Sequence, residues 1–192
     1  MIDDYMNPLE DPRLPAYFTT VPDTNIYLGG IYGASNPFID YSTVGDVITT
    51  DPTFPCLILS YVEVEFYLAE AAARGFTNGL PEDHYNKGIE ASFDYWGVAD
   101  VADYLAKPEV AYATAAGDWK EKIGTQAWLA MYNNGYLGWT EWRRLGYPNL
   151  NPPPGMSQGD IPIRFTYPVF EQTLNCSSYD AAAASIGGDA LT

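Results

Sequence analysis

Residues 60–76, SYVEVEFYLAEAAARGF, form the stretch that decides the fold class. Apolar side chains recur there at three- and four-residue steps, as on the buried face of an α-helix. Glu70 stands four residues before Arg74, which suits an ion pair along one helix face, and Gly75 is a natural helix end. The stretch predicts a largely buried helix over 59–74, with a stripe formed by Leu59, Val62, Phe66, Ala69 and Ala73.

The next segment repeats the pattern after a short loop. Pro81-Glu82-Asp83 is a typical amino-terminal helix signal, and it predicts a second helix over about 82–96. A loop of about six residues makes the two helices antiparallel neighbours, a hairpin of tetratricopeptide-repeat size. Its apolar stripe is expected to comprise Tyr85, Ile89, Phe93 and Trp96.

Outside the hairpin, the sequence predicts shorter elements. Residues 1–56 are rich in Pro, Gly, Asp and Tyr, which indicates an ordered loop region, with 11–15 extended by its prolines and a short hairpin near 29–33. We expect a mainly α fold with long ordered loops, forming a single domain over 1–192: 1–56 loop-rich, 57–146 a helical core, 147–192 loop and short helices. Further helices are expected at about 99–105, 117–133, 139–146, 168–173 and 178–186, with Gly135 as an interruption.

The composition limits the kind of partner. The formal charge is −16, from 25 acidic and 9 basic residues, which disfavours nucleic-acid binding and electrostatic attachment to a membrane. Aromatic residues make up 15% of the 192, and exposed rings suit the faces of sugars. An uncharged sugar polymer is a compatible partner, and solubility alone explains the charge equally well.

No catalytic, metal or cofactor site is predicted. The sequence lacks the common hydrolase, metalloprotease and nucleotide-binding motifs, and His84 is interpreted as a solvated surface residue. Residues 40–51 resemble a calcium loop only faintly, because Val44 replaces a ligand. Glu63 and Glu70 lie two turns apart, but hydrogen bonding or ion pairing is favoured over the role of a glycosidase pair.

Two further features leave alternatives open. Cys56 and Cys176 could form one disulfide or remain two buried thiols. Trp139 and Trp142 lie on one predicted helix face beside Arg143 and Arg144, where stacking could bind sugar or a partner chain. A core position, with the arginines paired to carboxylates, is favoured.

Several longer strings resemble the SusD/RagB family, the "starch-binding" nutrient-uptake lipoproteins of Bacteroidetes-type bacteria. They occur in the family's order along nearly the whole chain. The strings are DPRLPAYF (11–18), SYVEVEFYLAEAAARGF (60–76), YNKGIEASFDYWGV (85–98), IGTQAWLAMYNNG (123–135), WTEWRRLGYPNL (139–150), IPIRFTYPVFEQTLN (161–175) and IGGDALT (186–192).

The resemblance implies a non-enzymatic, mostly helical protein at the outer-membrane surface. Such proteins deliver oligosaccharides or other nutrients to a SusC-like TonB-dependent porin. Family members are about twice this length and begin with a signal peptide and a lipidated cysteine. We therefore expect this chain to be a carboxyl-terminal part, with its lipid anchor outside these residues.

The matching strings are scaffold, so the ligand site is predicted from physics instead. Sugar stacking needs rings on loops with amide or carboxylate groups nearby. The loop over 23–54 offers Tyr27, Tyr32, Phe38 and Tyr41, with Asn36 and Asp40 (and Asn25) as polar partners. Packing of these rings onto the helices is the competing interpretation. A helical protein–protein interaction scaffold and a glycoside hydrolase are the rival functions.

Overall fold

The computed structural model describes residues 1–191 and divides them into two compact units. The first unit comprises residues 1–31 and 35–149, and the second comprises 32–34 and 150 onward. Each unit is described by itself, and the expectation of a single domain stays a prediction. The described part of the chain is helical and contains no β-strand, which confirms the mainly α fold class.

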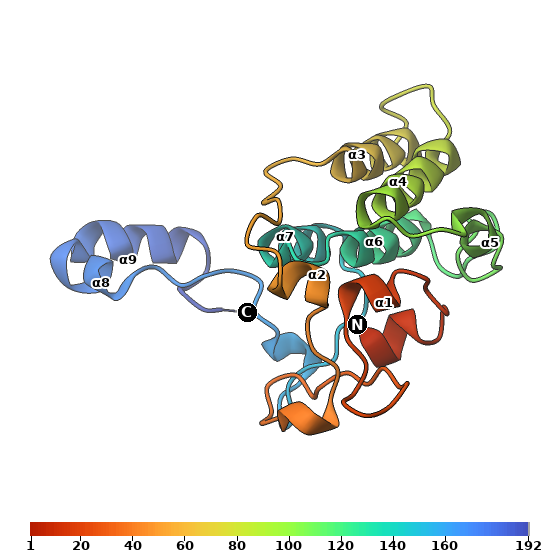
Figure 1. Ribbon diagram of the computed structural model, residues 1–192. Helices are drawn as coiled ribbons and strands as arrows, with labels where there is room; N and C mark the ends of the chain where they lie inside the picture. The colour runs from red at the N-terminus through yellow and green to blue at the C-terminus, as the bar shows by residue number, and fades with distance from the viewer. Residues whose placement is uncertain (192) are drawn as a thin grey trace. The chain divides into compact units, whose positions relative to one another are not determined.

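Helices α3 and α4 form an antiparallel hairpin on one side of the first unit (Figure 1). Helix α3 (Tyr61–Ala73) begins at the N-cap Ser60, whose hydroxyl accepts a hydrogen bond from the Glu63 amide. Helix α4 (Pro81–Trp96) starts on its proline and ends on Gly97 in the left-handed conformation. The two helices pack along each other through Phe66 and Ile89, both buried. The hairpin is confirmed, although Leu59 lies before the helix and is exposed.

Helices α5 (Val101–Leu105), α6 (Trp119–Ala130) and α7 (Gly135–Leu145) complete the helical core. Helix α6 packs against α3, α4 and α7, so it lies at the centre of the bundle (Figure 1). Gly135 was predicted to interrupt a helix, but in the structure it is the first residue of α7. Helix α6, expected over 117–133, ends at Ala130. Helix α7, expected to begin at residue 139, begins at Gly135.

The first 17 residues correct the expectation of an extended segment at 11–15. Residues Ile2–Met6 form one π-helical turn, and Leu14–Tyr17 form α1, with Pro15 in its first turn. The amides of a first helical turn have no acceptor within the helix, so a proline there loses no hydrogen bond. Helix α1 buries Leu14 and Tyr17 in a second apolar cluster with Ile2, Met6 and Leu129.

The loop from Phe18 to Ser60 contains only two short turns of helix, Phe38–Asp40 (η2) and Asp46–Thr49 (α2). It is held by backbone hydrogen bonds from Thr19 to Thr43 and from Gly45 to Tyr17. A Cβ at Gly45 would lie 2.7 Å from the Ala16 carbonyl oxygen, so this close approach requires glycine. The expected hairpin near 29–33 is absent from the described residues, where one isolated bridge joins Phe18 and Val44.

The second unit contains η3 (Gln158–Asp160), α8 (Val169–Leu174) and α9 (Cys176–Ser185). Ser157 and Asp160 form a reciprocal capping box around η3. Asp189 accepts hydrogen bonds from the Arg164 guanidinium and from the Tyr167 amide, which ties the end of the described chain to the segment before α8. No helix among the described residues is long and apolar enough to cross a bilayer.

A buried polar network fastens the amino-terminal segment to the bundle. The Arg13 guanidinium is fully buried and donates to both carboxylate oxygens of Asp11, at 3.0 and 2.6 Å. It also donates to Ser92 on α4 and to Gln126 on α6. Burial opposes its charge, but the fields of Tyr17 and Asp11 raise the pKa of Arg13 overall. The arginine therefore links three parts of the fold and stays charged.

Tyr17 contrasts with this network, because its buried hydroxyl has no hydrogen-bond partner among the described residues. Its ring stacks on Tyr132 at 4.3 Å between centroids and meets Trp96 edge-on at 4.8 Å. Replacing Tyr17 by phenylalanine keeps these ring contacts and removes an unsatisfied buried hydroxyl. We expect Tyr17→Phe to leave the free energy of unfolding unchanged or raise it by up to about 1 kcal/mol, as measured by urea unfolding.

The matched control is Tyr132→Phe. The Tyr132 hydroxyl donates to the Tyr17 carbonyl oxygen at 2.7 Å, so the same deletion there breaks a hydrogen bond. That variant is expected to lose about 1 kcal/mol. Equal losses for the two variants would show that the Tyr17 hydroxyl also has a stabilising partner.

Candidate ligand-binding site

The first unit contains a hollow of about 240 Å³, hereafter the aromatic hollow, between the segment 54–60 and the ends of two helices. Helix α4 ends here at Trp96 and α6 ends here at Ala130. Its volume lies just below the lower limit of roughly 300 Å³ for small-molecule pockets, so it suits a single ring of a ligand.

Four aromatic rings form much of the lining: Phe54, Tyr95, Trp96 and Tyr132. Phe54 stacks on Trp96 with 5.9 Å between centroids and 30° between planes. Tyr95 meets Trp96 edge-on at 5.3 Å. Burial raises the pKa of Tyr132 to about 12, so its hydroxyl is neutral at physiological pH. Aromatic rings are the side chains against which the C–H face of a sugar packs well.

Two amides at the end of α6 supply polar groups. Asn133 has a positive φ of 66°, the left-handed conformation that asparagine tolerates better than most residues. Asn134 is the N-cap of α7, yet its side chain makes no capping bond. Neither side-chain amide has a hydrogen-bond partner within the described residues, so both are available to ligand hydroxyls.

A second, wider hollow of about 560 Å³ adjoins the first and shares Leu57, Ser60, Val62 and Tyr95 with it. It continues along the exposed side of the hairpin, where Lys87, Glu90 and Asp94 project from α4.

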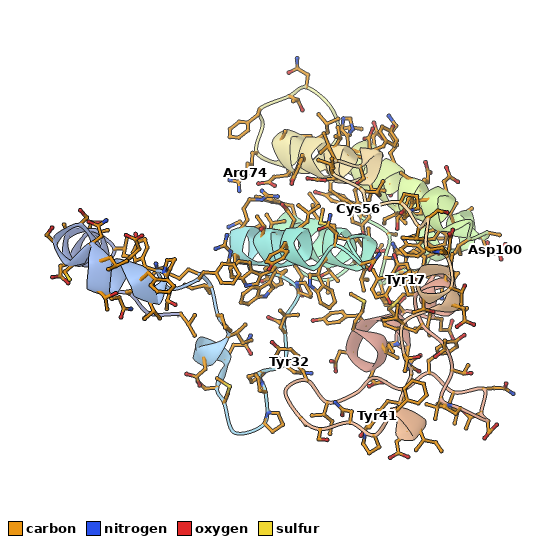
Figure 2. The ribbon with its side chains drawn as sticks, turned by 60° about the vertical axis from the view of Figure 1, so that its left-hand side comes forward. Tyr17, Tyr32, Tyr41, Cys56, Arg74 and Asp100 are labelled. Atoms are coloured by element: carbon orange, nitrogen blue, oxygen red, sulfur yellow. The ribbon has the colours of Figure 1, made fainter. Side chains whose placement is uncertain are left out.

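None of the six residues predicted from the loop lines the aromatic hollow. Within the first unit, Figure 2 shows Tyr41 apart from Cys56, which lines that hollow. Phe38 and Asp40 are exposed on η2, whereas Tyr27 packs on the cluster around Met6. The Asn36 amide is used within the loop, because it bonds the backbone of Ile31 at 2.8 and 2.9 Å. Tyr32 is 69% exposed and belongs to the second unit. Whether these six residues bind ligand stays a prediction.

Other sequence-based interpretations are decided by the structure. Arg144 pairs with Glu70 and Glu141, and Glu70 also pairs with Arg74, which confirms the structural reading of these charges. Trp142 is buried, while Trp139 is half-buried with the Arg143 guanidinium over its ring. The ion pair of Arg144 with Glu70 joins α7 to α3.

The expectations for His84 and for the cysteines need correction. His84 is partly buried, with 21% of its side chain exposed, and its Nδ1 lies 2.7 Å from Glu65 on the facing helix, so it is not a fully solvated surface residue. Cys56 and Cys176 are free and exposed, so they form neither the disulfide nor the buried thiols considered above. Cys56 lines the aromatic hollow.

Sequence reasoning missed the aromatic hollow. The signal lay in the strings DYW (94–96) and YNNG (132–135), which place rings and amides at two helix ends. No pattern in the sequence predicts that the ends of α4 and α6 lie together beside Phe54.

The fold and the hairpin define a helical protein of tetratricopeptide-like architecture, and comparison with known proteins gives its family. The chain belongs to the SusD-like family: a family model described as "Starch-binding associating with outer membrane" matches residues 1–168. A search of curated proteins gives no match.

Several solved structures are similar to this chain. A SusD homologue from Bacteroides thetaiotaomicron is 28% identical, with a TM-score of 0.78 over 97% of this chain and 48% of its own. A chitin-binding protein is 32% identical, with a TM-score of 0.81 over 100% of this chain and 47% of its own. A chitin-binding SusD homologue from Flavobacterium johnsoniae is 27% identical, with a TM-score of 0.80 over 97% and 46%. The chain thus spans about half the length of these relatives.

Proposed function

We propose that this chain acts in a non-catalytic glycan-binding protein of an outer-membrane nutrient-uptake system. The observation that carries the proposal is the aromatic hollow, which combines ring faces with two unengaged amides. Aromatic faces pack against sugar C–H groups, and amides bond sugar hydroxyls. The starch- and chitin-binding descriptions of the family and of two similar structures agree with this class of ligand.

The partner is proposed to be a SusC-like TonB-dependent porin, with the protein held at the outer-membrane surface. Support comes from the family's description as associating with the outer membrane. Co-purification of the tagged protein with a porin from outer-membrane extracts tests this part. Recovery of the protein without any porin would count against it.

The glycan-binding proposal predicts saturable binding of at least one neutral oligosaccharide without cleavage. Calorimetry with a panel of neutral oligosaccharides, followed by product analysis, is the measurement. Phe54→Ala is expected to weaken binding about tenfold, because loss of one stacking ring costs about 1–2 kcal/mol. Asn134→Ala is expected to weaken binding severalfold at little cost in stability, since that side chain makes no cap.

The loop residues supply the matched comparison. If Tyr41→Ala weakens binding and Phe54→Ala does not, the ligand binds at the predicted loop instead of the aromatic hollow. Absence of binding across the panel would contradict the proposal for this chain. Slow turnover that one carboxylate substitution abolishes would favour the glycoside hydrolase.

A further inference from the structure

The charged side chain that lines the aromatic hollow is negative. Among the described residues that line it, Glu63 is the single charged side chain, and no lysine, arginine or histidine contributes. Glu63 is 7% exposed, and its unbonded oxygen is not among the buried polar atoms without a partner in the described part of the chain, so that oxygen keeps some contact with solvent. A buried carboxylate without a cation is costly, and such groups usually pair with a positive charge or with several donors.

The Glu63 carboxylate shares its hydrogen-bond donor, the Tyr67 hydroxyl, with a second carboxylate. The Tyr67 hydroxyl lies 3.0 Å from one Glu63 oxygen and 3.1 Å from one Glu141 oxygen. Since a hydroxyl carries one proton, the two carboxylates compete for it. Burial and the nearby Glu141 and Glu63 raise the pKa of Tyr67, so that proton remains on the phenol.

The competition is unequal. Glu141 is also paired with Arg144, whereas Glu63 has no ion pair within the described residues. The other carboxylate oxygen of Glu63 has no hydrogen-bond partner in the described part of the chain. Glu63 therefore has capacity for a donor, and the hollow beside it is where that donor can come from.

The surroundings favour a cationic donor over a neutral one. Four of the residues that line the hollow are aromatic, and aromatic rings attract an ammonium group placed near their faces. The adjoining hollow adds Glu90 and Asp94 against one Lys87. The net charge of −16 also raises the local concentration of cations around the protein.

We propose that the aromatic hollow binds an amine-bearing sugar unit, with its protonated amino group against Glu63 and its ring face on the aromatic lining. This inference rests on the proposed glycan-binding function and names the class of sugar. A glucosamine-type unit has the required groups, namely a flat C–H face, hydroxyls for Asn133 and Asn134, and one ammonium. The acetylated unit lacks the charge.

The test compares two ligands that differ in that charge, a glucosamine trisaccharide and its fully N-acetylated counterpart. Binding is measured by calorimetry on the 192-residue chain at mildly acidic pH, where the ligand's amine is protonated. The amine form is expected to bind about tenfold more tightly. Raising the salt concentration should weaken the binding of the amine form and leave that of the acetylated form nearly unchanged.

Glu63→Gln retains the size of the side chain and its bond to Tyr67 but removes the charge, so the tenfold preference should disappear. Glu109→Gln, an exposed carboxylate that lines neither hollow, is the matched control and should retain the preference. If Glu63→Gln does not fold, the salt dependence of the unmodified chain decides, and a preference insensitive to salt would overturn the inference.

The two proposals fail differently. Equal or tighter binding of the acetylated trisaccharide overturns the inference about the amine and leaves glycan binding intact. Binding of neither trisaccharide, together with no binding across the neutral panel, overturns both.

Discussion

Arg13→Met is expected to lower the free energy of unfolding by about 3–5 kcal/mol, because it leaves the Asp11 carboxylate buried without its cation. Asp11 is 3% exposed, and the guanidinium supplies two of its hydrogen bonds. Ser92 and Gln126 also lose a donor. Urea unfolding followed by circular dichroism measures the change.

The matched control is Arg143→Ala. Arg143 is exposed and contacts the Trp139 ring at 4.2 Å, so its loss should cost no more than about 1 kcal/mol. The double variant Arg13→Met with Asp11→Leu removes both members of the buried pair and should recover part of the loss. If Arg13→Met is as stable as Arg143→Ala, the buried polar network contributes little to the free energy of unfolding.

Phe66→Ala is expected to cost about 3–5 kcal/mol, through lost burial and the cavity that remains. The ring is 1% exposed and packs edge-on against Tyr85 across the hairpin. A Cβ at Gly88 would lie only 3.0 Å from it, so α4 already approaches the ring as closely as glycine allows. The cavity therefore cannot close by a small shift of either helix.

Phe76→Ala makes the same chemical change at a site that is 76% exposed, just past the end of α3. It should change the free energy of unfolding by less than about 0.5 kcal/mol. Similar losses at both positions would mean that the ring at position 66 is not in the core of the folded chain.

The helix hairpin was predictable because its signals are local. The apolar repeat of α3, Pro81 at the start of α4 and the i,i+4 pair of Glu70 and Arg74 all operate within a few residues, and the observed bounds agree within two. Pro15 misled the prediction, because a proline in a first turn and a proline in an extended segment look the same in sequence.

The candidate site was not predictable, because its residues are far apart in the sequence. Phe54, Trp96 and Asn134 meet only after α4 and α6 have packed, and no spacing along the chain encodes that contact. The predicted loop was chosen for its content of rings and amides. That content cannot distinguish Tyr27, which packs on the helices, from Phe38, which faces solvent.

The buried arginine also bears on the order of events in folding. Its hydrogen bonds to Ser92, Tyr104 and Gln126 span 79, 91 and 113 residues, whereas the hairpin of α3 and α4 closes over a short turn. Long closures are entropically costly before their contacts form, so the hairpin is expected to assemble first and the amino-terminal segment last. Contacts made after the rate-limiting step govern the unfolding rate. Arg13 thus sets how long the assembled bundle keeps its first 17 residues in place, and stopped-flow kinetics of Arg13→Met should show faster unfolding at an unchanged folding rate.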